Sequence, residues 1–185
     1  MATSTATTAN PITTWQIDPV HSEVGFSVRH LMISTVKGRF TDVQGTLQYD
    51  ETDPTRSNIE VRIAIASVDT RADQRDAHLR SADFFDAEHY PFMTFKSTRV
   101  ERTGEGRGKV TGDLTIRGVT QSVTLDAKRE GRGKDPWGGE RLGFSATTVL
   151  NREAFGLTWN QALETGGVVV GDEVKVSIEV EWVKQ

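Results

Sequence analysis

The side chains best suited to metal binding or proton transfer in this chain are four histidines, His21, His30, His78 and His89. Neutral imidazole is a good ligand for zinc and other transition metals. Two histidines four residues apart on a helix, or two apart on a strand, would share one face, and neither spacing occurs here. We therefore expect surface or rim histidines and predict no metal site.

Nucleophilic catalysis has equally little support. The chain contains no cysteine, and it lacks the Gly-x-Ser-x-Gly sequence that exposes a serine nucleophile on a sharp turn. Ser22 follows His21 directly, but a catalytic hydroxyl and its base are brought together by folding rather than by adjacency in the chain. The sequence therefore predicts no catalytic residues.

Two other segments suggest functional sites only superficially. Residues 104–109, GEGRGK, have glycines too closely spaced for a phosphate-binding loop, and Val110 stands where Ser or Thr would hold magnesium. A hairpin turn explains this segment better. Asp83 and Asp86 could transfer protons, but carboxylates near a helix end are usually solvated charges. We expect no cofactor.

Alternation of apolar with polar or small residues dominates the chain from Trp15 onward, and this period places every second side chain on one face of a strand. Turn-forming segments at 53–54, 103–106 and 135–139 separate the runs. About eight antiparallel strands with short connections predict a barrel or a sandwich. The alternating residues are Val24, Phe26, Val28, Val43, Gly45, Leu47, Tyr49, Ile59, Val61, Ile63, Ile65, Val110, Gly112, Leu114, Ile116, Val123, Leu125, Ala127, Leu142, Phe144, Ala146, Val174, Val176, Ile178, Val180 and Trp182.

Residues 70–86 break the alternation and favour a helix. The segment is rich in good helix formers, and Thr70 is a candidate N-cap with Asp73 three residues further on. We predict a helix from Thr70 to about Ser81. A second, weaker helical turn is predicted after Asn151.

The composition limits the partners and the location of the protein. Its 185 residues suit one domain, and a net charge of -4 with interspersed charges argues against a nucleic-acid-binding protein. No apolar stretch approaches the roughly 20 residues that span a bilayer. Residues 1–13 lack the features of a signal peptide. We predict a disordered leader over 1–13, a barrel over 14–185 and a cytoplasmic location.

Large apolar side chains also lie outside the alternating runs. They are consistent with an ordinary core, but an eight-stranded barrel is just wide enough either to be filled by its own side chains or to hold one ligand. Gly45, Gly112 and Ala146, if they point inward, favour a hollow barrel. Periodicity alone does not separate the two alternatives. These side chains are Leu79, Phe84, Phe85, Phe92, Phe155, Leu157 and Trp159.

A series of motifs resembles the YceI-like family. The opening segment is WQIDPVHS (15–22), followed by VGFSVRH (24–30) and VKGRF (36–40). Later motifs are SVDT (67–70), HLRSADFFD (78–86) with YP (90–91), GDLTIRGVT (112–120), LNR (150–152), FG (155–156) and VGDEV (170–174). The resemblance extends in order from residue 15 to residue 183.

The resemblance implies an all-β fold, namely an extended eight-stranded antiparallel lipocalin-like β-barrel with one or two short helices capping it. It further implies an apolar tunnel that holds a polyisoprenoid or another long-chain amphiphile. Family members often form homodimers, and many carry a signal peptide and work in the periplasm or outside the cell, a feature from which this sequence departs. The family supplies no established catalytic residues, so none is carried over.

We therefore expect non-enzymatic binding, transport or storage of a polyisoprenoid, quinone or fatty-acid-like lipid, with no nucleic acid among the partners. The alternative is an isomerase or hydrolase that acts on a lipid in the same cavity through His21 or His30 near its mouth. Residues 70–92 are expected to cap one end and control ligand entry. The expected apolar lining consists of Phe26, Val28, Phe40, Leu47, Ile63, Ile65, Leu79, Phe84, Phe85, Phe92, Phe95, Ile116, Phe144, Phe155 and Trp159.

Overall fold

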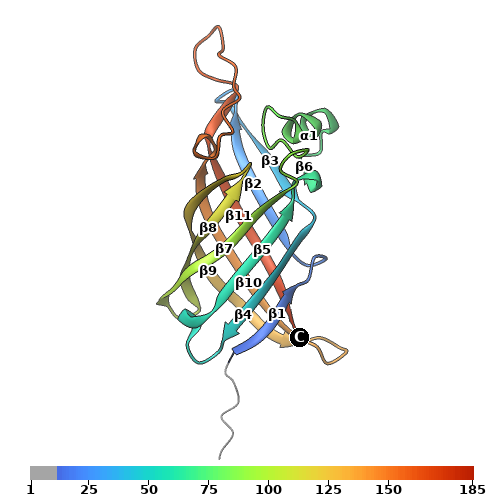
Figure 1. Cartoon of the computed structure of the whole chain (residues 1–185), viewed down its shortest axis with the longest axis vertical. Helices are drawn as coiled ribbons and strands as arrows, with labels where there is room; N and C mark the ends of the chain where they lie inside the picture. Colours follow the sequence, from blue (N-terminus) through green and yellow to red (C-terminus); the bar gives the residue numbers. More distant parts are fainter. Residues whose placement is uncertain (1–11) are drawn as a thin grey trace, which may run out of the picture.

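A computed structural model describes residues 12–185 and shows a closed antiparallel β-barrel (Figure 1). Each strand of the ring pairs with the next, and the ring closes where the first strand pairs with the last. This arrangement confirms the predicted eight-stranded barrel. The ring consists of β1 (Ile12–Ile17), β4 (Val43–Asp50), β5 (Asn58–Ala64), β7 (Phe92–Gly104), β8 (Arg107–Ile116), β9 (Val119–Lys134), β10 (Glu140–Asn151) and β11 (Val170–Lys184).

Three further strands, β2 (Glu23–His30), β3 (Ser34–Phe40) and β6 (Val68–Asp69), lengthen the barrel at one end. β2 continues beside β11 beyond the point where β1 ends, since Ile17 pairs with Trp182 and Val24 pairs with Ile178. In the same way β3 continues into β4, and β5 continues into β6 after a short break. Three long strands of the barrel are therefore interrupted rather than continuous.

An ionic cluster stabilises the turn between β1 and β2, where the strand is interrupted. Arg141 of β10 contacts the carboxylates of Asp18 at 2.6 Å, Glu181 at 2.5 Å and Asp135 at 3.0 Å. The Nδ1 atom of His21 lies 2.9 Å from Asp18. The hydrogen bond with His21, together with Arg141, holds the pKa of the Asp18 carboxyl well below its usual range. The cluster thus ties β10 and β11 to the turn that ends β1.

The helix α1 (Asp73–Arg80) lies at the end of the barrel where β3 and β6 are found (Figure 1). Its C-terminus agrees with the prediction, but Thr70 is not its N-cap, because the cap position is Ala72. The backbone NH and the hydroxyl of Thr70 instead donate to the Asp76 carboxylate at 2.9 and 2.5 Å. Thr70 therefore binds the side chain of a helix residue, Asp76, but it does not begin the helix.

Three turns of 3-10 helix complete the fold: η1 (Pro54–Arg56), η2 (Ile65–Ser67) and η3 (Arg152–Phe155). The last of these confirms the predicted turn after Asn151, whose side chain accepts a hydrogen bond from the Glu153 NH at 2.9 Å. Within residues 12–185, no helix has the length and apolar character needed to cross a membrane.

The predicted leader ends too late. Ile12 and Thr13 already belong to β1, where they pair with Asp50 and Tyr49. The Thr13 hydroxyl accepts a hydrogen bond from the indole NH of Trp15 at 2.8 Å, and Trp15 is fully buried. The leader prediction was therefore wrong for these two residues, which complete a barrel strand. The rest of the predicted leader, residues 1–11, lies outside the described residues.

Candidate functional site

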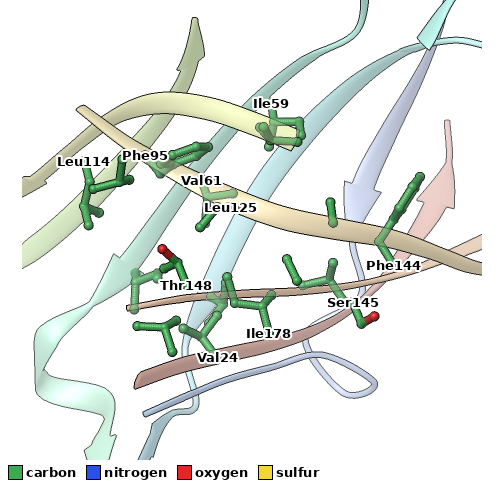
Figure 2. A pocket seen from close by; sticks show the side chains of 18 of the residues that line it. Val24, Ile59, Val61, Phe95, Leu114, Leu125, Phe144, Ser145, Thr148 and Ile178 are labelled. Atoms are coloured by element: carbon green, nitrogen blue, oxygen red, sulfur yellow. The ribbon is translucent and has the colours of Figure 1, made fainter. Parts of the chain in front are cut away.

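A cavity of about 530 Å³ lies inside the barrel. The alternation seen in the sequence builds it, because every second residue of most strands points inward. In Figure 2, Val61 of β5, Leu125 of β9 and Ile178 of β11 project into the same space from different strands. The lining is mainly aliphatic and aromatic, so the interior offers an apolar surface to a long hydrocarbon chain.

Most of the residues expected to line the cavity do so. They come from seven strands and from the segment that contains α1, and hence from positions far apart in the sequence. Whether these side chains contact a ligand stays a prediction. The expected residues found in the lining are Phe26, Val28, Phe40, Leu47, Ile63, Leu79, Phe84, Phe85, Phe95, Ile116 and Phe144.

Ile65 and Phe92 are not among the lining residues. Ile65 follows the end of β5 and begins η2, so the inward alternation of that strand stops before it, and its side chain packs in the core. Phe92 is 43% exposed, and its neighbour Met93 takes the inward position. The guanidinium of Arg62 lies 4.6 Å from the Phe92 ring centroid on the outer surface. Phe92 therefore faces away from the cavity.

Phe155 and Trp159 also lie outside the lining. Phe155 belongs to η3 and is buried in the core. Trp159 follows η3 and packs behind Phe84, with ring centroids 5.4 Å apart. Both residues are absent from the lining, because neither belongs to a strand whose alternation would direct it inward.

The glycines expected to hollow the barrel have a different role. A Cβ atom on Gly112 would lie 2.5 Å from the Phe95 ring, and one on Gly45 would lie 2.8 Å from the Ile17 side chain. Neighbouring side chains therefore already cover both positions. Of the three small residues expected to favour a lumen, only Ala146 lines the cavity. The glycines make room for packed neighbours and not for a ligand.

Residues 70–91 close one end of the cavity with apolar side chains, as expected for a cap. Phe84 is buried, and Phe85 packs edge-on against Phe40 of β3. The segment is also anchored through its backbone, because Arg117 donates a hydrogen bond to the Phe84 carbonyl at 2.9 Å. Whether the cap opens to admit a ligand stays a prediction.

The opposite end of the cavity has a polar rim. It is formed near the β4–β5 and β7–β8 connections, which lie away from α1 (Figure 1). The rim includes Glu51 and Ser57 on one side and, on the other, the charged residues Glu101, Arg102, Glu105, Arg107 and Arg129. Sequence reasoning missed these arginines, although Arg129 continues the inward run of Val123, Leu125 and Ala127. The same alternation would have found it.

One arginine, Arg152, lines the cavity while being almost fully buried. Its guanidinium donates to the carbonyls of Leu157 at 2.6 Å, Trp159 at 2.9 Å and Gly171 at 2.8 Å. Two weaker contacts reach Val170 and Asp172. Because its donors are thus occupied, Arg152 fastens the segment before β11 and has no free donor for a ligand.

The histidines proposed for a lipid-modifying enzyme do not reach the cavity, because neither His21 nor His30 belongs to its lining. His21 instead takes part in the ionic cluster at the β1–β2 turn, where one atom each of Asp18, His21 and Glu181 lie within 4.8 Å of one another. The cation Arg141 already contacts both carboxylates of this group. Arg141 therefore already balances the charge of these two carboxylates.

A family model described as the YceI-like domain matches residues 15–182. Among curated relatives, a UPF0312 protein of Pseudomonas putida (strain W619) is 43% identical over 165 residues, which cover 89% of this chain and 82% of the relative. The family model thus spans nearly all of the barrel, which begins at β1 and ends with β11.

Solved structures agree with this match. The YceI protein of Campylobacter jejuni is 37% identical, with a TM-score of 0.74 over 85% of this chain and 90% of that one. A polyisoprenoid binding domain from Saccharophagus degradans, implicated in plant cell wall breakdown, has a TM-score of 0.66 at 15% identity and covers 92% of this chain and 98% of that one. The second likeness concerns the fold alone. The chain described here belongs to the YceI-like family.

Proposed function

We propose that this protein binds a long-chain isoprenoid, or a similar apolar amphiphile, inside its barrel and carries or stores it without changing it chemically. The observation that carries the proposal is the cavity of about 530 Å³, whose lining is mainly aliphatic and aromatic along the strands and has a polar rim at the end away from α1. A ligand that matches this lining has a long apolar body and one polar end.

The energetics favour such a ligand. Burying one five-carbon prenyl unit contributes ~4 kcal/mol at about 0.8 kcal/mol for each carbon group. The ordering of a flexible chain offsets a large part of this gain, so affinity does not rise in proportion to chain length. A few buried units are nevertheless enough for stable binding.

The S. degradans neighbour supports the ligand class, because its barrel has the same fold and is described as polyisoprenoid-binding. Low identity separates the two chains, so the support comes from the barrel architecture and not from shared binding residues. The curated relatives are called UPF0312 proteins, a name that specifies no ligand. Quinones and fatty-acid derivatives therefore stay within the proposed class.

The placement of the histidines does not favour the enzymatic alternative, because His21 and His30 lie outside the lining. Native mass spectrometry of freshly purified protein tests the carrier function. We expect a co-purified lipid that leaves unaltered on denaturation, and no turnover of added prenyl alcohol or ester. Steady conversion of the added lipid would contradict the carrier function and support the enzymatic alternative.

The same native spectra test the expected homodimer, since they give the mass of the assembly with and without lipid. The transport role and a cytoplasmic location belong to the proposal as well. A transfer assay between donor and acceptor vesicles would measure the first, and cell fractionation with an antibody against the folded protein would measure the second.

A further inference from the structure

The turn between β2 and β3 presents large apolar side chains to solvent. It consists of Leu31, Met32 and Ile33 and lies at the end of the barrel where α1 is found (Figure 1). Met32 is 54% exposed and Ile33 is 77% exposed. Single exposed apolar residues are common on protein surfaces, but these two are adjacent and stand at the tip of a hairpin. They form a protruding apolar point.

The backbone of the turn does not favour such residues. The Ile33 NH donates to the His30 carbonyl at 3.1 Å, and Leu31 and Met32 between them have positive φ angles of 52° and 61°. A turn with positive φ at both central positions favours Asn and Gly and strains bulkier side chains. Leu31 and Met32 are therefore not explained by the turn itself, and such strain is typical of positions with a function.

The neighbouring backbone holds the turn in place and leaves its tip uncovered. The Leu31 NH donates to the Val169 carbonyl at 2.9 Å, and the Arg29 guanidinium donates to the Met32 carbonyl at 2.9 Å. On one side Met32 faces Gly167, where a Cβ atom would lie 3.5 Å from its side chain. The tip is thus presented by an ordered turn, which lowers the entropy lost on binding.

The hairpin below the tip is positively charged. Between Glu23 and Asp42 at its base, it contains three Lys and Arg and no Asp or Glu. Arg29 and Lys37 are exposed and form no ion pair with any residue in the range 12–185, whereas Arg39 is paired. Acidic residues of this region belong to the segment next to the hairpin, and they are Glu164, Asp172 and Glu173. The unpaired positive charges therefore lie on the hairpin that carries the tip.

We propose that Met32 and Ile33 dock the protein on the surface of an anionic lipid bilayer, with Arg29 and Lys37 at the level of the head groups. Two side chains are too small for a stable protein interface, in which each partner buries roughly 800 Å². Docking on a bilayer requires only a few inserted apolar side chains with cations beside them. The inference goes beyond the proposed function, since it concerns where the protein binds and not what its cavity holds.

Docking through this tip brings the capped end of the cavity to the bilayer. Val28 of β2 and Phe40 of β3 line the cavity, so the hairpin continues from the tip into the cavity wall. Phe40 also contacts Phe85 of the cap, with ring centroids 5.8 Å apart. The end of the barrel that residues 70–91 close is therefore the end that faces the lipid.

The test measures flotation of the full-length protein with vesicles of phosphatidylcholine, either pure or mixed with phosphatidylglycerol. The variant is Met32→Gly combined with Ile33→Ser, because glycine suits the positive φ of residue 32. The matched control is Val20→Ser, which removes an apolar side chain that is 81% exposed from the turn between β1 and β2. The charge is tested by Lys37→Gln, with Lys109→Gln near the opposite end of the barrel as its control.

We expect the parent to float with the mixed vesicles and the tip variant to bind them roughly tenfold more weakly, because it has lost the apolar side chains that insert. Val20→Ser should bind like the parent. Lys37→Gln should weaken binding to the mixed vesicles about threefold and leave binding to the neutral vesicles unchanged, whereas Lys109→Gln should change neither. The melting temperature of the tip variant should be no lower than that of the parent, since glycine relieves the strain at residue 32.

Absence of the parent from both kinds of floated vesicle would overturn the inference and leave the proposed lipid binding intact, because native spectra measure that binding separately. Equal weakening by the tip variant and by Val20→Ser would assign the effect to exposed apolar surface in general. If the tip variant unfolds, Ile33→Ser alone decides the question, and unchanged flotation of that variant rejects the docking role. A parent dimer that the tip variant loses in sedimentation would show that a second copy covers the tip.

Discussion

The ring of Phe85, which follows α1, packs edge-on against the ring of Phe40 near the end of β3, with centroids 5.8 Å apart and planes at 79°. Both side chains line the cavity. A residue of the capping segment therefore touches a barrel strand directly across the end of the cavity. If residues 70–91 act as a lid, this aromatic contact must separate whenever a ligand passes through that end.

Replacement of Phe85 by alanine should speed the release of bound lipid several-fold. Phe85 is only partly buried, so the loss of stability should be less than the roughly 3–5 kcal/mol measured for fully buried phenylalanines. Stopped-flow displacement with a fluorescent prenyl probe gives the release rate, and thermal unfolding gives the stability. Phe92→Ala is the control, since it removes an aromatic ring from the outer surface. Unchanged release in Phe85→Ala would argue for a permanent plug.

Replacement of Val61 by tryptophan should block lipid binding. Val61 projects into the middle of the cavity (Figure 2), and the larger indole would occupy the space that the ligand requires. Overpacking costs about 1–3 kcal/mol, so the barrel should still fold. Val149→Trp, on an exposed position of β10, is the control. Retention of lipid by a folded Val61→Trp protein in native spectra would show that the ligand lies elsewhere.

Two truncations should distinguish the contribution of residues 1–11 to stability from that of the first two residues of β1, Ile12 and Thr13. Removal of residues 1–11, which are rich in Thr and Ala, should leave the melting temperature unchanged, because so little apolar surface cannot offset the ordering of the chain. Removal of residues 1–13 should lower it, because the buried Trp15 indole loses the Thr13 acceptor. An unpaired buried donor costs about 1–3 kcal/mol. Equal melting temperatures of the two truncated proteins in calorimetry would contradict this role of Thr13.

The ionic cluster around Asp18 should make stability depend on pH in the acidic range. Because the pKa of Asp18 is lowered in the folded state, its contribution is present above its ordinary value of 3.8 and is lost as the pH falls through the lower folded value. Asp18→Asn should therefore be less stable than the parent at pH 7, and the difference should shrink below pH 3.8. Urea unfolding at a series of pH values measures this difference.

The control for that series is Asp113→Asn. Asp113 is an exposed residue of β8, which lies opposite β1 in the ring of strands. The stability of this variant should follow that of the parent at every pH. A constant difference between Asp18→Asn and the parent from pH 7 down to strongly acidic conditions would show that the variant acts through geometry and not through the charge of Asp18.

The alternation in the sequence predicted the strands, and the resemblance to the YceI-like family predicted the closed barrel and its apolar cavity; most of the residues expected in the lining are found there. Inward and outward side chains alternate with a period of two, so the runs around Val24, Leu47 and Val176 identify their faces without any knowledge of the neighbouring strands. The helix near residue 75 and the turn after Asn151 were likewise predicted locally, the helix from its residue propensities and not from its cap, since Ala72 and not Thr70 is the N-cap. These are features whose causes lie within a few residues of chain.

The tertiary structure decided what depends on contacts between distant segments. Ile65 leaves the inward row because β5 ends before it, and Gly112 gives no lumen because the ring of Phe95, from another strand, covers it. Arg102 and Arg129 meet at the rim of the cavity in the same way, because only the pairing of β7 with β8 and of β8 with β9 brings their strand ends together. Alternation assigns a face to a side chain, but only the assembled barrel determines what occupies the space in front of it.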